Sequence, residues 1–182
     1  MKRINRLLPA LAALGLLLGS LPAQAQSADL GALRAGFLLN FAKLASWPEA
    51  RFAAADAPLR VCLLADDPSL EALGKSLSGK PVGSHALELV PVSNAAAIRT
   101  GNCHLAYLGP EAQPRYGELM AALAASGALI VDEGSRFSWP DGMIRLFVED
   151  GRMRFELNLD AVEKAGLKID PRLIRLARLA AR

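Results

Sequence analysis

Short apolar runs alternate with amphipathic stretches through the middle of this chain. An apolar run of a few residues bounded by turn residues is typical of a buried strand, whereas apolar residues at every third or fourth position are typical of a helix. These patterns predict strands at 59–65, 86–92, 103–108 and 128–132, and helices at 29–46, 67–77, 93–99 and 111–125. Strands that alternate with helices predict a parallel sheet covered by helices on both faces.

The sequence after residue 142 breaks this alternation and predicts an antiparallel hairpin. The dipeptide Asp150–Gly151 separates the segments 143–149 and 152–159, and it is a strong signal for a two-residue turn. In the resulting register one face carries the apolar residues Ile144, Leu146, Val148, Met153, Phe155 and Leu157. The other face carries Met143, Arg145, Phe147, Glu149, Arg152, Arg154, Glu156 and Asn158. A slip of one residue would destroy both patterns, so the register is well specified.

Helices at the two ends complete the predicted architecture. In the first, Asp29 caps the start and Trp47–Pro48 ends the helix. Its apolar stripe comprises Leu30, Leu33, Phe37, Phe41 and Leu44. The last helix has Asp170 as its cap and Pro171 at its first position, with an apolar side formed by Leu173, Ile174, Leu176, Ala177 and Leu179. We therefore expect an α/β fold with a mostly parallel sheet flanked by helices, ending in an antiparallel hairpin and a C-terminal helix.

The first 25 residues predict export. Met1–Ala25 begins with basic residues, continues with an apolar run from about Leu7 to Leu18 and ends with Ala23-Gln24-Ala25, which is the pattern of a cleaved signal peptide. The apolar run is too short to cross a bilayer, which needs roughly 20 residues. We expect cleavage near Ala25, so that residues 26–182 form a single domain.

Removal of this leader changes the charge of the protein. Three of the 21 Lys and Arg residues lie in the leader, which leaves 18 basic residues to match the 18 Asp and Glu residues. A formal net charge of zero provides no basic surface for nucleic acid, whose binding depends on clustered Lys and Arg. We therefore expect no nucleic-acid partner.

Cys62 and Cys103 are the only cysteines of the chain. An even number of cysteines in an exported protein favours one intramolecular disulfide. A buried pair of free thiols and an intermolecular bridge are the alternatives. A metal site has less support, because neither cysteine belongs to a C-x-x-C motif and only His104 lies nearby.

Residues suited to catalysis are sparse. His85 and His104 are the only histidines, and no serine lies in a G-x-S-x-G motif, so we expect no enzyme and no cofactor. We interpret His104 as a hydrogen-bonded structural residue. The acidic pairs Asp66–Asp67 and Asp132–Glu133 follow predicted strands, where α/β proteins bind ligands, although helix capping explains them equally well. An alternative function is therefore the binding of a small ligand in a strand-end cleft near Asp66 and Asp132.

The polar face of the hairpin is the candidate partner-binding surface. It combines Arg145, Phe147, Arg154, Glu156 and Asn158, and an aromatic residue among arginines is the composition of a protein-binding patch. If a helix covers this face, Phe147 belongs to the core and the charges mark its rim. If no helix covers it, these side chains are available to a partner. The sequence leaves both arrangements open.

Specific strings along the chain resemble those of a known family. They comprise Arg34–Lys43 leading to Trp47–Pro48, Cys62–Leu64, Gly79–Val82, Cys103–Tyr107, Gly142–Ile144, Arg154–Leu159, Ala165–Ile169 and the Leu-rich end. Together they cover nearly all of the chain after the leader, in order, and they resemble the YfiR family of exported regulators.

The resemblance implies regulation by binding rather than catalysis. Members of this family are periplasmic repressors that bind the periplasmic sensor domain of an inner-membrane diguanylate cyclase, and an OmpA-like outer-membrane lipoprotein relieves the repression. The output is cyclic-di-GMP signalling and biofilm behaviour. The resemblance further implies a homodimer and a disulfide that maps onto Cys62 and Cys103.

Overall fold

The computed structural model describes residues 23–133 and 142–180, and these form a sheet covered by helices on both faces. Within them, the main sheet has the strand order β10-β8-β7-β6-β5-β2-β4-β3. Its strands are β2 (Leu59–Leu64), β3 (Pro81–Val82), β4 (His85–Val92), β5 (Leu105–Leu108), β6 (Leu129–Asp132), β7 (Ile144–Glu149), β8 (Arg152–Leu157) and β10 (Arg178–Leu179). Two further short strands, β1 (Ala45–Ser46) and β9 (Lys168–Ile169), pair with each other.

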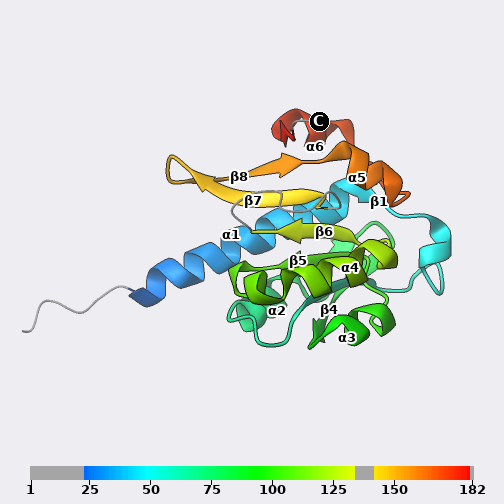
Figure 1. Ribbon diagram of the computed structural model, residues 1–182, viewed down its shortest axis with the longest axis horizontal. Coiled ribbons are helices and arrows are strands. Elements are labelled where there is room, and N and C mark those ends of the chain that lie inside the picture. The colour runs from blue at the N-terminus through cyan, green and yellow to red at the C-terminus, as the bar shows by residue number, and fades with distance from the viewer. Residues whose placement is uncertain (1–22, 134–141, 181–182) are drawn as a thin grey trace, which may run out of the picture.

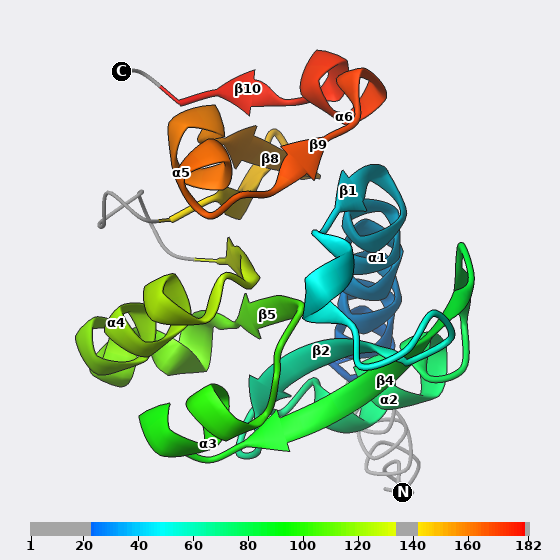
Figure 2. The same ribbon diagram turned by 90° about the vertical axis from the view of Figure 1, so that its right-hand side faces the viewer.

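The helices form two layers around this sheet (Figures 1 and 2). They are α1 (Ala23–Leu44), α2 (Leu70–Leu77), α3 (Ala95–Thr100), α4 (Tyr116–Ser126), α5 (Leu159–Lys164) and α6 (Pro171–Leu176), with 3₁₀ turns η1 (Glu49–Arg51) and η2 (Pro110–Arg115). Helices α1 and α2 pack together on one face, and α3 and α4 pack together on the other. Every residue of β5 and β6 is buried, as expected for parallel strands covered on both sides.

The predicted fold class is confirmed, and so is the register of the hairpin. Strands β4, β2, β5, β6 and β7 run parallel to one another, whereas β3 pairs antiparallel with β4 and β8 pairs antiparallel with β7. Ile144 faces Leu157 and Glu149 faces Arg152, as the turn at Asp150–Gly151 predicts. Both turn residues have positive φ, which is the conformation that a type I′ turn requires.

The prediction for the first helix needs correction at both ends and in its stripe. Helix α1 begins at Ala23, so Asp29 lies inside it rather than at its cap, because the Ala and Gln residues before Asp29 are good helix formers. Leu30 and Leu33 are exposed. The buried positions in this part are small residues instead: a Cβ on Gly31 would lie only 3.2 Å from the Cβ of Ala72 in α2. Because α1 and α2 approach closely at these small residues, Leu30 and Leu33 lie at the sides of the contact between the two helices.

Other boundaries shift for local reasons. Helix α2 begins at Leu70, after a turn in which Asp67 accepts hydrogen bonds from Ser69. The predicted helix at 111–125 divides into η2 and α4, because Pro114 lacks the backbone donor that an α-helix needs. The sequence did not predict the short elements β1, η1, β3, β9, α5 and β10. The strand expected to reach residue 159 ends at Leu157 and is followed by α5, and the expected last helix ends at Leu176 and is followed by β10.

The predicted apolar side of the last helix is also only partly correct. Asp170 caps α6 by accepting a hydrogen bond from the backbone of Arg172, and Pro171 is its first residue. Leu173 is buried, but Leu176 and Leu179 are exposed, because the chain leaves the helix after Leu176 and extends along the edge of the sheet.

Candidate interaction surface

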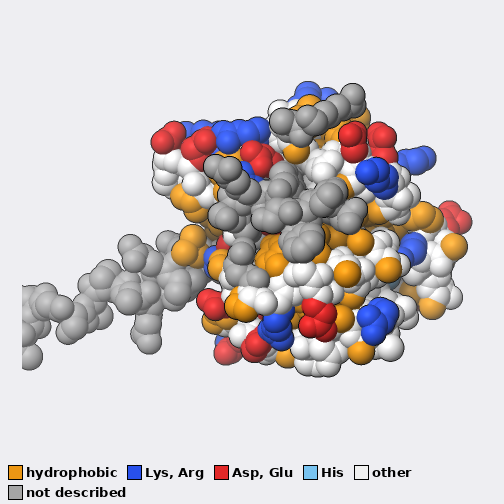
Figure 3. Space-filling model, viewed as in Figure 1, with side chains coloured by type: hydrophobic (Ala, Val, Ile, Leu, Met, Phe, Trp, Pro, Cys, Tyr) orange, Lys and Arg blue, Asp and Glu red, His pale blue; other side chains and the backbone are white. Residues whose placement is uncertain are grey.

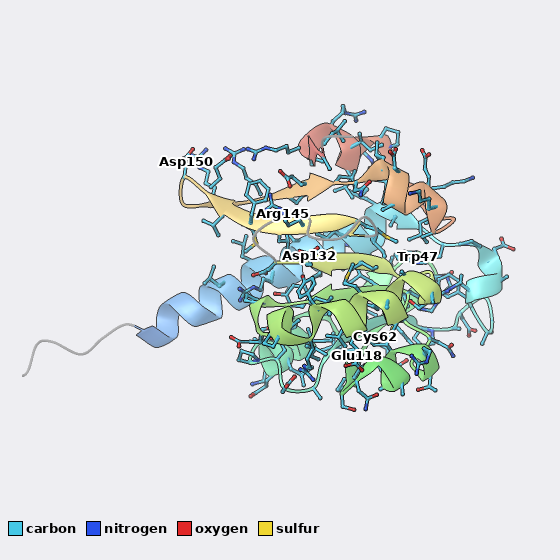
Figure 4. The ribbon with its side chains drawn as sticks, viewed as in Figure 1. Trp47, Cys62, Glu118, Asp132, Arg145 and Asp150 are labelled. Atoms are coloured by element: carbon cyan, nitrogen blue, oxygen red, sulfur yellow. A yellow bond between two sulfur atoms is a disulfide. The ribbon has the colours of Figure 1, made fainter. Side chains whose placement is uncertain are left out.

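The end of the sheet at which the parallel strands begin is held by a disulfide between Cys62 of β2 and Cys103, just before β5. The two Cα atoms lie 5.6 Å apart, and both side chains are buried. The structure thus confirms the intramolecular bridge and excludes the free-thiol and intermolecular alternatives. Cys62 is labelled in Figure 4.

His104, next to this disulfide, is a structural residue as predicted. Its Nδ1 atom accepts a hydrogen bond from the backbone N–H of Arg60 at 3.0 Å, and its Nε2 atom lies 3.1 Å from the carbonyl of Arg51. This arrangement requires the neutral imidazole with its proton on Nε2. Burial lowers the pKa of His104. The ring of Phe52 stacks between His104 and His85 at centroid distances of 4.3 and 3.9 Å. Both ring nitrogens of His104 therefore have backbone partners, and its face is packed against Phe52.

At the other side of the molecule, the polar face of the hairpin is built around an ion pair. Arg145 of β7 and Glu156 of β8 are cross-strand neighbours, and their side chains meet at 2.6 Å. The side chains are only 12% and 16% exposed. In Figure 4, Arg145 is labelled on β7, and Asp150 marks the turn of the hairpin. The pair therefore forms the partly buried floor of the candidate surface.

Phe147 lies above this floor, between two guanidinium groups. The Cζ atom of Arg145 is 4.8 Å from the centre of its ring, and that of Arg178 is 5.0 Å from it. Arg178 belongs to β10, which pairs parallel with β8 so that Arg178 is beside Glu156. A cation over an aromatic face is an attractive contact. The sequence left open whether the polar face of the hairpin is covered or exposed. In the structure this face is partly covered, because the edge strand β10 places Arg178 over it.

The rim of the surface is a second, more exposed charge cluster. Glu149 accepts hydrogen bonds from Arg178 at 2.7 and 2.8 Å, and Arg154 lies 3.2 Å from the same carboxylate. The hydrogen bond from Arg178 lowers the pKa of Glu149, so this carboxylate is charged at neutral pH. Figure 3 shows basic and acidic side chains side by side over the hairpin, at the upper left.

The structure divides the five predicted binding residues into three groups. Arg145, Phe147 and Glu156 form the connected floor, and Arg154 lies on the exposed rim. Asn158 has a separate role as the cap of α5, where its Oδ1 atom accepts a hydrogen bond from Ala161 at 3.1 Å. Sequence reasoning missed Arg178, which joins floor and rim, because the heptad-like spacing of leucines around it predicted a helix rather than an edge strand. We call Arg145, Phe147, Glu149, Arg154, Glu156 and Arg178 the hairpin surface.

The acidic residues that follow the predicted strands lie in different surroundings. Asp66 lies at the surface, where its carboxylate accepts hydrogen bonds from Arg115 at 2.8 and 2.9 Å. The buried Asp132 lies beside Tyr116 of α4, whose pKa is raised by burial and next by this carboxylate. A pocket of about 420 Å³ opens instead beside Asp67, Tyr107 and Arg34. This pocket is lined by Asp67 and by neither Asp66 nor Asp132.

A buried ion pair supports the wall of this pocket. Arg34 of α1 donates two hydrogen bonds to Glu133, at 2.6 and 2.7 Å, and the hydroxyl of Tyr107 donates to the same carboxylate at 2.8 Å. The hydrogen bond to Glu133 raises the pKa of Arg34, and burial raises that of Tyr107. Both groups therefore remain protonated, and α1 is fixed to the end of β6.

Two further observations limit the chemistry of the described residues. In the ranges 23–133 and 142–180, no three His, Cys, Asp or Glu side chains are grouped as metal ligands. No helix in that part of the chain is long and apolar enough to span a membrane.

Comparison with solved structures gives only remote likenesses. A conserved domain protein from Vibrio cholerae O1 biovar El Tor is 9% identical with a TM-score of 0.49, and the match covers 67% of this chain and 54% of that one. An ABC domain in complex with L-Trp from Streptococcus pneumoniae is 7% identical with a TM-score of 0.47, covering 68% of this chain and 56% of that one. The chain thus spans little more than half of either structure. No curated protein sequence matches it.

A comparison with family models is decisive. The model described as YfiR/HmsC-like matches residues 31–178, which include all the described strands except the last residue of β10. The matched range also contains both cysteines and the whole hairpin surface. The chain therefore belongs to the YfiR/HmsC-like family, a regulatory and non-catalytic family of periplasmic proteins that suggests a role in cyclic-di-GMP signalling.

Proposed function

We propose that this protein represses an inner-membrane diguanylate cyclase by binding the cyclase's periplasmic sensor domain, and that the hairpin surface makes the contact. The observation that carries the proposal is the family match over residues 31–178. On this view an OmpA-like outer-membrane lipoprotein relieves repression by binding the repressor, and the repressor acts as a homodimer. Cyclic-di-GMP signalling and biofilm formation are the output.

The geometry of the hairpin surface supports a role in protein binding. Arginine and aromatic side chains contribute most to the affinity of many protein interfaces. Here Phe147 is held between Arg145 and Arg178, and both guanidinium groups are themselves held by glutamates. Side chains that are ordered before binding lose less conformational entropy when the partner arrives. The surface is therefore preorganised to receive a partner.

Repression then follows from differential affinity. A repressor shifts the cyclase toward its inactive arrangement only to the extent that it binds this arrangement more tightly than the active one. The exposed rim supplies charges that can select one arrangement of a sensor domain, since a mismatch of like charges at an interface weakens binding. Capture of the repressor by the lipoprotein would lower its free concentration and restore activity.

Delivery to the periplasm is part of the proposal. We propose that Met1–Ala25 is a signal peptide removed near Ala25; most of this segment lies outside the described residues. Sequencing the N-terminus of protein purified from the periplasmic fraction tests this step. An N-terminus at or near Gln26 is expected, and an intact Met1 on cytosolic protein would contradict it.

The central experiment measures cyclase activity with the periplasmic sensor domain present. Addition of purified repressor should lower the rate of cyclic-di-GMP synthesis, and Arg154→Glu should weaken this effect by about tenfold in the concentration required, because it reverses an exposed charge at the rim. The matched control is Arg99→Glu, since Arg99 is also exposed but lies on α3, away from the hairpin. Unchanged cyclase activity at saturating repressor would defeat the proposal. Equal effects of the two variants would remove the hairpin surface from it.

A further inference from the structure

The pocket beside Asp67 lies where the sheet changes its direction of winding. From β2 the chain passes through α2 to β4 on one side of β2, and it then returns through α3 to β5 on the other side. Helix α2 lies on the face that α1 covers, whereas α4, which follows β5, lies on the opposite face with α3. The crevice outside the carboxyl ends of two such strands is the topological switch point, where open α/β sheets bind ligands.

The walls of the pocket come from three segments that meet at this crevice. They are α1 with Leu30 and Arg34, the turn after β2 with Asp67 and Pro68, and the segment after β5 with Pro110 and Glu111. The volume of about 420 Å³ is in the range of ligand sites, roughly 300–1,000 Å³. Leucine, proline and the ring of Tyr107 make much of the lining apolar. The pocket can therefore hold the apolar body of a small molecule.

Asp67 is the polar group that is placed to fix a ligand. Only 6% of the residue is exposed. Its Oδ1 atom accepts hydrogen bonds from the backbone and the hydroxyl of Ser69, at 2.8 and 2.5 Å, whereas no residue in the described part of the chain donates a hydrogen bond to Oδ2. Gly109 lets this oxygen lie directly against the backbone, because a Cβ there would overlap Oδ2. Oδ2 is therefore an acceptor on a largely buried residue, and a ligand that brings a donor would complement it.

The charges around the pocket indicate the sign of that ligand. The guanidinium of Arg34 is occupied by a two-pronged ion pair with Glu133. The remaining charged residues of the pocket are Asp67 and, at the exposed rim, Glu111. A ligand therefore meets a net negative charge. An anion would be repelled here, and a neutral molecule would bring no charge to balance that of Asp67.

We propose that this pocket binds a small organic cation, a protonated amine on an apolar or aromatic body, with the amine donating to Oδ2 of Asp67. The body would lie against Leu30 and Pro110. A charged hydrogen bond of this kind contributes more than a neutral one, which makes the ligand's charge decisive for affinity. The proposal is independent of the repressor function, because the residues that line this pocket include none of the hairpin surface and the binding requires no partner protein.

The test titrates three compounds with the same ring into the purified protein by calorimetry at neutral pH: phenethylamine, phenethyl alcohol and phenylpropionate. Phenethylamine should bind about tenfold or more tightly than the alcohol, which corresponds to one charged hydrogen bond, and phenylpropionate should bind least. Equal affinity for the three compounds, tighter binding of the anion, or no heat from the amine up to about 10 mM, the weak limit of specific binding, would each overturn the proposal. These outcomes use the unaltered protein, so no variant has to fold.

A pair of adjacent aspartates locates the site. Asp67→Asn should lower the affinity for phenethylamine about tenfold while leaving that for phenethyl alcohol nearly unchanged, because it removes the charge but retains an oxygen for Ser69. Asp66→Asn is the matched control, since Asp66 is 68% exposed and bound to Arg115. Equal losses in the two variants would show that the amine binds a diffuse surface charge and not this pocket.

Discussion

The parallel part of the sheet and the hairpin part are stabilised by different means. In the parallel part, β5 and β6 are buried throughout and a disulfide joins β2 to the start of β5. In the hairpin part, β7, β8 and β10 present a layer of ion pairs around Phe147 on one face. Burial and a covalent link respond little to salt or to a partner's charge, whereas exposed ion pairs respond to both. The part that is stable in itself and the part that can recognise a partner are thus separated.

One type of interaction occurs in both parts and sharpens this contrast. Arg60 and Glu88 are cross-strand neighbours on β2 and β4, as Arg145 and Glu156 are on β7 and β8. The first pair has a closest distance of 3.1 Å and side chains 36% and 45% exposed, against 2.6 Å, 12% and 16% for the second. The Arg60–Glu88 pair is therefore exposed to solvent, whereas the Arg145–Glu156 pair is mostly buried. Removal of one partner should lower the free energy of unfolding much more in the buried pair, because the remaining charge is poorly solvated there.

The largest effect is expected from the disulfide. The variant Cys62→Ala/Cys103→Ala should lower the free energy of unfolding by roughly 3–4 kcal/mol, because the bond closes a loop between residues 41 positions apart in the unfolded chain. Urea titration of the variant, followed by circular dichroism, measures the loss. Reduction of the unaltered protein should produce a similar loss. A loss below about 1 kcal/mol would show that packing alone maintains the parallel part.

The second prediction compares the two arginine–glutamate pairs. Glu156→Gln should lower the free energy of unfolding by about 2 kcal/mol, because Arg145 keeps its charge in a poorly solvated place. Glu88→Gln, the matched control, should cost no more than about 0.5 kcal/mol, since Arg60 remains hydrated. Urea titration of both variants at low and high salt measures the difference. Equal costs would contradict the assignment of a solvent-excluded floor to the hairpin surface.

This comparison also bears on the choice of residues for binding experiments. From the sequence, substitution of Glu156 is a reasonable test of partner binding, because Glu156 shares the polar face of the hairpin with Arg154. The structure makes it part of the floor, so its loss affects stability and partner binding together. Arg154, on the rim, is the cleaner probe of binding.

The sequence predicted the fold class and the hairpin register because both depend on local patterns. A period of two on either side of Asp150–Gly151 allows only one pairing, and the structure has that pairing. Strand β10 depends on tertiary pairing instead. The apolar pattern that ends at Leu179 predicts a continuous helix, so the role of Arg178 could not be read from the chain.

The pocket illustrates the same limit at the level of single side chains. Asp66 and Asp67 both follow β2, and nothing in their local sequence decides which of them faces the crevice. The turn decides it: the backbone N–H of Asp67 donates to the carbonyl of Leu64, which directs its side chain inward toward Gly109. Likewise the small residue Gly31 of α1, rather than Leu30 or Leu33, lies against α2 and sets the distance between the two helices there.

The smallest expected effect is a difference in how the stability of the two parts of the sheet depends on pH. Burial lowers the pKa of His104 below its ordinary value of 6.5, so the unfolded chain binds more protons at this residue than the folded one does between those two pKa values. Stability should therefore fall as the pH drops below about 6.5. In the hairpin part, the pKa of Glu149 is lowered by Arg178, so its contribution is present above the ordinary carboxylate pKa and is lost only in stronger acid.

Substitution of the imidazole tests this separation. His104→Gln retains a donor and an acceptor but cannot titrate, so its free energy of unfolding should change less than that of the unaltered protein between about pH 7.5 and 5.5. Urea titration at the two pH values gives both differences, and the comparison cancels any fixed cost of the substitution. If the two proteins lost equal stability over this range, the neutral, structural imidazole would not be the acid-sensitive element of the parallel part. The sensitivity to mild acid would then not come from His104, and pH would no longer distinguish the two parts of the sheet.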